Sequence, residues 1–444
     1  MSAGPAGHDD HPDRPGDDDL PPDPFAGKPD PFASGLGAPG DPGSLGALGD
    51  LGAPGDLGAL SGLGAMGGLF GELMRMASAQ GPLNWDSARQ IAIWSAAGGQ
   101  VEPAIDPLER IRLEEFCKIA EPHVAEATGL TVSTRGVTVV AHTRSAWAAQ
   151  ALQDYRPLLE RLAASMAAPR TETDPAAGTD PLAGLGQLMA PMLLGLQVGS
   201  LVGQLAQTSL ATYDLPLPRP VGDVIGFVPV NIEAFAREWS IPRETAGMHL
   251  CVAELTMHAV LRQAHVRALL LDLLQQYASA FRFDPNMLAG QLDGIDPTDL
   301  SSLESVFANP RGLLASMESP EQARVRGRID VLVSTVVGYV EHVVASTGAR
   351  LLGDNRQVME AWKRRRIEAG DGERMAGQML GLSVDQETYD RGVAFIGGVL
   401  ERAGSDGVAE LWSAPDHLPT ASELAAAGLW LARIGKDMRA TGDD

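Results

Sequence analysis

The most promising group of chemically active side chains lies on one predicted helix in the middle of the chain. Glu254 and His258 are four residues apart, and His265 follows seven residues after His258. Residues at i and i+4 share a helix face, and a carboxylate with two imidazoles can ligate Zn²⁺. The same spacing is common where Glu and His simply interact on a helix surface, which is the interpretation we favour. A metal site with Glu254 as its base remains the alternative.

Other reactive residues are better explained as structural. His342 follows Glu341 on a predicted helix, and we interpret it as a partly exposed helix residue that could at most be a distant metal partner. The basic run Lys363-Arg364-Arg365-Arg366 ends another predicted helix, where cations are favoured, and we expect it to pair with acidic side chains of the same chain; the alternative is that it binds a phosphate or carboxylate group. Cys117 and Cys251 stand in apolar helical segments and are predicted to be inert core thiols.

Composition excludes several classes of protein. The formal net charge is −23, with 34 Lys and Arg against 57 Asp and Glu, so phosphate backbones and anionic lipid surfaces are repelled. We therefore expect no nucleic-acid partner and no role at a membrane surface. Two cysteines are too few for a disulfide framework or a cysteine-rich zinc site, and the acidic N-terminus lacks the apolar core of a secretory signal. These features predict a cytoplasmic protein.

The chain divides by composition into a tail and a folded domain. Residues 1–68 pass from a Pro/Asp-rich into a Gly/Leu-rich stretch, and we expect this tail to be disordered because ordering glycine costs backbone entropy and proline denies hydrogen bonds. Residues 69–444 carry mostly helical periodicity with few strand signals. The predicted fold class is therefore mainly α, with a few short strands.

Several elements can be placed by pattern. Asn84 and Asp86 are cap candidates for an early helix, and residues 130–143 alternate like a small hairpin around Arg135-Gly136.

The apolar segment 182–214 raises the question of a membrane span. Its glutamines, the helix-breaking Pro191 and the absence of flanking basic clusters favour a buried helix instead. Its glycines at four-residue spacing predict close packing on a neighbouring helix: Gly195, Gly199 and Gly203.

The central region is predicted to hold a strand and two helices. Residues 224–230 form the strand, Asn231 caps the helix that follows, and a single long helix runs from Pro242 to about Tyr277. Short helices are also expected from residue 69 and from about residue 145 to 166. Later helices are expected over residues 298–308, 320–346, 357–366, 385–402 and 422–434.

The order of short segments resembles the bacterial family of zincin-like, zinc-dependent metallopeptidases, whose members are often labelled only as hydrolases of unproven activity. The resemblance runs from about Leu83 to the end of the chain. It rests on collinear pieces: Leu83-Asn84-Trp85-Asp86, Ser209-Leu210, Leu215-Pro216-Leu217, Ile241-Pro242-Arg243, Tyr277-Ala278, Arg282-Phe283-Asp284, Ile295-Asp296-Pro297, Met359-Glu360, Leu380-Gly381-Leu382 and Pro415-Asp416-His417-Leu418-Pro419-Thr420.

This resemblance implies a zincin-like helical domain in which a His-Glu-x-x-His helix and a downstream Glu bind zinc. Carried over without gaps, the two His positions fall on Val252 and Thr256, the Glu falls on Ala253, and the later Glu falls on Val337. None of these side chains matches. A hydrocarbon side chain offers no lone pair to Zn²⁺, so the inherited site cannot form in this register.

A shift by one residue does not restore the motif. It places Glu254 on the catalytic carboxylate but leaves Ala253 and Met257 where imidazoles are needed. We therefore expect a non-catalytic family member without a cofactor, whose former groove holds a peptide or a partner helix. The alternative is an active zinc-dependent hydrolase with a site rebuilt from Glu254, His258 and His265.

Overall fold

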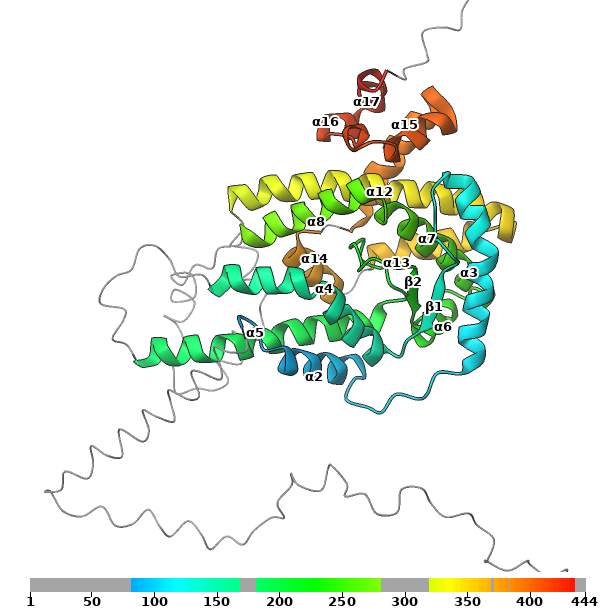
Figure 1. Ribbon diagram of the computed structural model, residues 1–444. Helices are drawn as coiled ribbons and strands as arrows, with labels where there is room; N and C mark the ends of the chain where they lie inside the picture. Colours follow the sequence, from blue (N-terminus) through cyan, green and yellow to red (C-terminus); the bar gives the residue numbers. More distant parts are fainter. Residues whose placement is uncertain (1–80, 168–180, 281–318, 369–370, 383, 436–444) are drawn as a thin grey trace, which may run out of the picture. The chain divides into compact units, whose positions relative to one another are not determined.

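The computed structural model describes residues 81–167, 181–280, 319–368, 371–382 and 384–435. The chain divides into two units, residues 1–67 and 68–444, and all described residues belong to the second. This described part is mainly helical with two short strands, as the sequence predicted (Figure 1). The predicted tail and the helices expected after residue 69 and over residues 298–308 lie outside the described residues.

Helices make up most of the described part of the chain. In chain order they are α2 (Trp85–Ala96), α3 (Pro107–Thr128), α4 (Arg144–Ala167), α5 (Pro181–Thr208), α6 (Pro229–Glu238), α7 (Arg243–Leu261), α8 (Ala264–Ser279), α12 (Pro320–Leu352), α13 (Arg356–Ile367), α14 (Asp371–Leu380), α15 (Gln386–Ala409), α16 (Ala421–Ala425) and α17 (Ala427–Arg433). Two 3₁₀ turns, η3 (Glu410–Trp412) and η4 (Pro415–His417), lie between α15 and α16.

Local side chains fix where some of these helices begin. The Asn84 side chain accepts a hydrogen bond from Ser87 N at 2.9 Å, so Asn84 is the N-cap of α2, as its sequence context predicted. At the start of α12, the side chains of Ser319 and Gln322 each accept a hydrogen bond from the other residue's backbone N–H. Such a cap satisfies backbone N–H groups that the helix leaves unpaired and stabilises it by about 1 kcal/mol.

The glycines of α5 permit close contact with α2. A Cβ added to Gly199 would lie only 2.3 Å from the backbone oxygen of Ala88, and a Cβ on Gly195 or Gly203 would lie 2.5 Å from Asn84, the N-cap of α2, or from Ser95. The predicted packing is therefore confirmed. The predicted break at Pro191 is wrong, because α5 continues through it and the Pro191 carbonyl accepts a hydrogen bond from Asn84 N. Packing on α2 outweighs the roughly 3 kcal/mol that an internal proline costs.

The two strands come from distant parts of the sequence. β1 (Thr138–Ala141) pairs in parallel with β2 (Val224–Phe227), and Val139 lies opposite Ile225. The hairpin predicted over residues 130–143 is therefore wrong. Only the second half of that segment forms a strand, because the backbone N–H and hydroxyl of Thr134 bind the Asp223 carboxylate instead of a facing strand.

The predicted long central helix is two helices. α7 ends at Leu261, Gln263 adopts an extended conformation as the N-cap of α8, and the chain turns there without a Gly or Pro.

Asn231 also differs from its predicted role as a cap. It lies inside α6, buried, and its side-chain amide donates hydrogen bonds to the carbonyls of Ala206 and Ser209 at the end of α5.

α12 is the helix around which the fold is assembled. It packs against α3, α7, α8, α15 and α16. By length and composition alone it could cross a membrane, but 67% of its most apolar window is buried inside the fold, as in the core helix of a globular domain. Among the described residues α5, where the sequence raised that question, does not meet the same criterion.

Two glycines of α12 allow a matched test of helix packing. A Cβ on Gly338 would lie 2.2 Å from the backbone of Gly392 in α15, whereas a Cβ on Gly327 would meet nothing within 4 Å. We predict that Gly338→Ala lowers the free energy of unfolding by at least about 1–3 kcal/mol through overpacking, whereas Gly327→Ala raises it by about 0.5–1 kcal/mol. Urea denaturation measures both, and a change of the same sign in the two variants would contradict the packing described.

Candidate functional site

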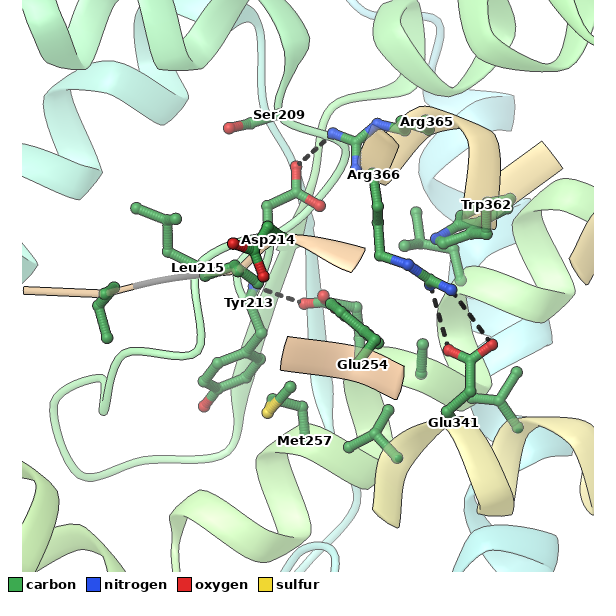
Figure 2. A pocket seen from close by; sticks show the side chains of 18 of the residues that line it. Ser209, Tyr213, Asp214, Leu215, Glu254, Met257, Glu341, Trp362, Arg365 and Arg366 are labelled. Carbon is green, nitrogen blue, oxygen red and sulfur yellow. Dashed lines mark hydrogen bonds and ion pairs between the residues drawn. The ribbon is translucent and has the colours of Figure 1, made fainter. Parts of the chain in front are cut away.

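A cavity of about 350 Å³ lies between α5, α7, α12, α13, α14 and the start of α15 (Figure 2). Its apolar walls include Leu205, Leu250, Val340, Val344 and Leu382. Its polar lining comes from several elements that are far apart in sequence and includes Ser209, Asp214, Glu254, Glu341, Arg365, Arg366, Arg374 and Asp385. The volume falls in the range of small-molecule and cofactor pockets.

α7 presents one face to this cavity. Ala253, Glu254 and Met257 line it, and His249 lines it one turn earlier. Val252 and Thr256 are fully buried in the core instead. Positions three and four residues apart share a helix face, so the periodicity of α7 selects which of its residues can meet a ligand.

Glu254 is a buried carboxyl at the edge of the cavity. Its side chain is 4% exposed and accepts a hydrogen bond of 2.9 Å from the backbone N–H of Tyr213. Burial, and then the nearby charge of Asp214, raise the pKa of Glu254 well above its usual range. The group is therefore a neutral acid at pH values where an exposed glutamate is ionised, and it can donate a hydrogen bond.

Two ion pairs also line the cavity. Arg365 contacts Asp214 at 3.3 Å and also donates to the carbonyl of Thr208. Arg366 binds both carboxylate oxygens of Glu341, the shorter contact being 3.2 Å, and its guanidinium stacks over the ring of Tyr389 at 4.0 Å. The basic run thus pairs with acids of its own chain, as predicted, and the charges of these pairs balance.

His249 is held as a neutral ring beside these charges. It packs on Trp362 with 4.4 Å between ring centroids. Burial and the positive charge of Arg366 lower the pKa of His249 to about 3. This histidine therefore contributes no charge to the cavity near neutral pH.

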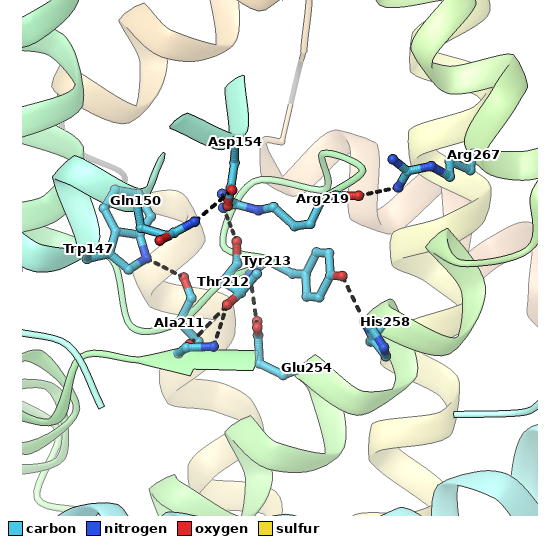
Figure 3. A network of polar contacts seen from close by, with 11 residues as sticks. Trp147, Gln150, Asp154, Ala211, Thr212, Tyr213, Arg219, Glu254, His258 and Arg267 are labelled. Carbon is cyan, nitrogen blue, oxygen red and sulfur yellow. Dashed lines mark hydrogen bonds and ion pairs between the residues drawn. The ribbon is translucent and has the colours of Figure 1, made fainter. Parts of the chain in front are cut away.

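A buried polar network positions the loop that carries Tyr213 and Asp214 (Figure 3). Arg219 and Asp154, exposed by 7% and 10%, form an ion pair of 2.9 Å, and Arg219 also donates to the carbonyl of Thr212. A buried pair of this kind would be costly to break, because each charge would lose its partner away from water. The loop is therefore held rigidly over α7.

His258 belongs to this network and faces away from the ion pairs. Its Nδ1 lies 2.9 Å from the Tyr213 hydroxyl, and its Nε2 lies 3.6 Å from Asp223. Burial lowers the pKa of His258 and raises the pKa of the Tyr213 hydroxyl, so burial favours the neutral form of both groups. His258 thus acts as a structural hydrogen-bond partner of Tyr213.

The three residues considered as a rebuilt metal site take separate positions. Glu254 lines the cavity, His258 binds Tyr213, and His265 lies on α8 beyond the helix break. Among the described residues, no group of three His, Cys, Asp or Glu side chains could hold a metal ion. His342 is half-buried on α12, burial lowers its pKa, and within the described chain it is not part of the cavity lining.

Sequence inspection missed several residues that shape the cavity. Asp214, Glu341 and Tyr389 carry no motif, because their roles depend on partners on other elements. Glu341 was noted only as the neighbour of His342, although it is the carboxylate that holds Arg366. One signal was available: a dense basic run in a strongly acidic chain implies acidic partners in the fold.

Comparison with known proteins gives a family and a fold. A family model described as a zincin-like metallopeptidase matches residues 83–431, which confirms the resemblance over nearly the same span. Among solved structures, the chain is similar to one described as "Crystal structure of a putative hydrolase with a novel fold from Chloroflexus aurantiacus". The TM-score is 0.56 and the identity 21%, over 80% of this chain and 99% of that chain, so the likeness concerns the fold alone. No curated protein matches.

The burial of Glu254 should make the stability of the protein depend on pH. Because its pKa in the folded protein is raised above the usual 4.5, the folded state holds one more proton than the unfolded state between these two pKa values. Its contribution to the free energy of unfolding therefore falls as pH rises, by up to about 1.4 kcal/mol per pH unit. Glu254→Gln removes this dependence. In urea denaturation the free energy of unfolding of the variant should therefore rise relative to that of the wild type between pH 5 and pH 8. Parallel pH profiles of the two proteins would contradict a neutral Glu254.

Proposed function

The chain belongs to the zincin-like metallopeptidase family, and we propose that it is a non-catalytic member, which uses the fold as a cytoplasmic binding or scaffolding protein. The observation that carries this proposal is the cavity face of α7. Where a zincin needs two imidazoles flanking a glutamate, this face has Ala253 and Met257 flanking Glu254. A catalytic zinc needs three well-placed protein ligands.

The side chains present do not fit zinc. In the alignment shifted by one residue, the two histidine positions fall on Ala253 and Met257, which line the cavity. In the ungapped alignment they fall on Val252 and Thr256, which are buried in the core. Neither the methyl of alanine nor the thioether of methionine replaces an imidazole on Zn²⁺. Glu254, the carboxylate that remains, is held by Tyr213 N–H and is buried without a cation.

The residues of α12 near the family's downstream glutamate position also support a non-catalytic role. Val337, the position of the family's downstream glutamate, is fully buried hydrocarbon. One turn later Glu341 does line the cavity, but both of its carboxylate oxygens bind the guanidinium of Arg366. An internal cation thus already neutralises the acidic group nearest to that position, and no metal charge is required there.

The cavity suits a peptide segment as its ligand. Its apolar walls can accept a hydrophobic side chain, and the neutral carboxyl of Glu254 can donate a hydrogen bond to a backbone carbonyl. We propose an extended peptide of a protein partner as the occupant.

Metal content provides the first test. The full chain, purified without a His tag, should contain well under one zinc per molecule by mass spectrometry, and a chelator should leave its melting temperature unchanged, since a bound ion would stabilise the folded state by several kcal/mol. Stoichiometric zinc that is lost from a Glu254→Ala, His258→Ala double variant would instead support the rebuilt hydrolase site.

A gain-of-binding experiment tests the register. Ala253→His combined with Met257→His should bind zinc measurably, because two imidazoles four residues apart on the cavity face of α7 can chelate one ion, although the third protein ligand of a catalytic site is still missing. Equilibrium dialysis should detect zinc bound to this variant and not to the wild type. The matched control is Val252→His with Thr256→His, which buries imidazoles in the core and should destabilise the fold without binding zinc. Zinc bound by the control alone would reverse the assignment.

Peptide binding can be tested by filling the cavity. Peptides selected from a random library on the wild-type chain should lose affinity at least about tenfold for Ala253→Phe, whose ring occupies the cavity. Ala323→Phe makes the same change on an exposed part of α12 and should leave affinity unchanged. Selected peptides that bind both variants equally well would show that they bind elsewhere.

A further inference from the structure

The two cysteines of the chain meet in the core. Cys117 on α3 and Cys251 on α7 are 134 residues apart in sequence, and their sulfur atoms lie 3.2 Å apart. They are 2% and 0% exposed. The chain has no other cysteine, so any intramolecular disulfide of this protein would have to join these two residues.

Close packing of α3 on α7 brings the sulfurs together. Gly247 lies one turn before Cys251, and a Cβ placed on it would come within 2.9 Å of the ring of Phe116, the neighbour of Cys117. Only a residue without a side chain permits this approach. A disulfide requires sulfur atoms about 2.05 Å apart, so the two atoms need to approach by only about 1.2 Å, within the reach of small side-chain rotations.

The sequence context predicts that Cys117 and Cys251 are inert; from their contact we propose instead that they form an oxidisable thiol pair, which hydrogen peroxide converts to an intramolecular disulfide linking α3 to α7. One sulfur attacks the peroxide, the O–O bond breaks, and a sulfenic acid and one water form. The second sulfur then attacks the sulfenic sulfur, the S–S bond forms, the S–O bond breaks and a second water leaves. Two electrons pass from the thiols to hydrogen peroxide, and both thiol protons end in water.

Burial determines how fast this reaction runs. Neither sulfur is accessible in the closed structure, and burial raises the pKa of the Cys251 thiol, so the reactive thiolate is scarce. Oxidation therefore requires α3 to separate locally from α7. The reaction should be slow in the native protein and faster in sub-denaturing urea, which increases the population of locally open states.

The link would act on the helix that carries the cavity. Glu254 follows Cys251 by three residues, so both lie within one turn of α7. A disulfide would fix this turn against α3 and would close a long loop of the unfolded chain. The melting temperature of the oxidised protein should therefore rise, on the order of 5 °C. This proposal is independent of whether the cavity binds a peptide or a metal ion.

The test uses the full chain with hydrogen peroxide in sub-denaturing urea, and refolding in a glutathione redox buffer as a second route that does not need access to the folded core. After denaturation, N-ethylmaleimide should add to neither cysteine of the oxidised protein and to both after reduction. The intact mass should fall by about 2 Da, and peptide mapping should find Cys117 linked to Cys251.

Single variants complete the experiment. Cys117→Ala and Cys251→Ala each keep one thiol, so they should neither lose this mass nor gain thermal stability after the same treatment. Two free thiols in the wild type after both routes would overturn the proposal. So would an oxidised product consisting of sulfinic acid or of a disulfide between two chains.

Discussion

Only one face of α7 reaches the cavity, and this constraint decides what chemistry the fold can carry. The helix is buried on nearly all sides by α3, α6, α12 and α13, so a ligand can meet only the stripe that includes Ala253, Glu254 and Met257. A side chain one position away points into the core, as Val252 and Thr256 do. Whether this stripe can bind a metal ion therefore depends on the residues at positions 253 and 257.

The electrostatics of the cavity follow from the same arrangement. Within the described part of the chain Glu254 forms no ion pair, and burial raises its pKa, whereas Glu341 and Asp214 are each held by an arginine of α13. Because these arginines neutralise the acids from within the chain, the cavity needs no bound cation to be stable. It offers a mixture of apolar wall, neutral donor and ion pairs, which supports the proposed binding of a ligand.

Sequence alone predicts the features that depend on local chemistry. The cap at Asn84, the close packing of Gly199 and the internal pairing of the arginine run all follow from residue type and spacing. Features that depend on distant partners could not be predicted. The parallel pairing of β1 with β2 and the contact of Cys117 with Cys251 join segments separated by long stretches of chain. The break before α8 has neither Gly nor Pro, so the periodicity appeared continuous and placed His265 on the wrong helix.

The proposed function depends on what occupies the space in front of Glu254, between Ala253 and Met257. Anomalous diffraction at the zinc absorption edge, from crystals of the untagged chain grown with zinc, can detect an ion in this space. We expect no anomalous peak in the cavity. A strong peak within coordination distance of Glu254, with tetrahedral geometry completed by other side chains, would contradict it.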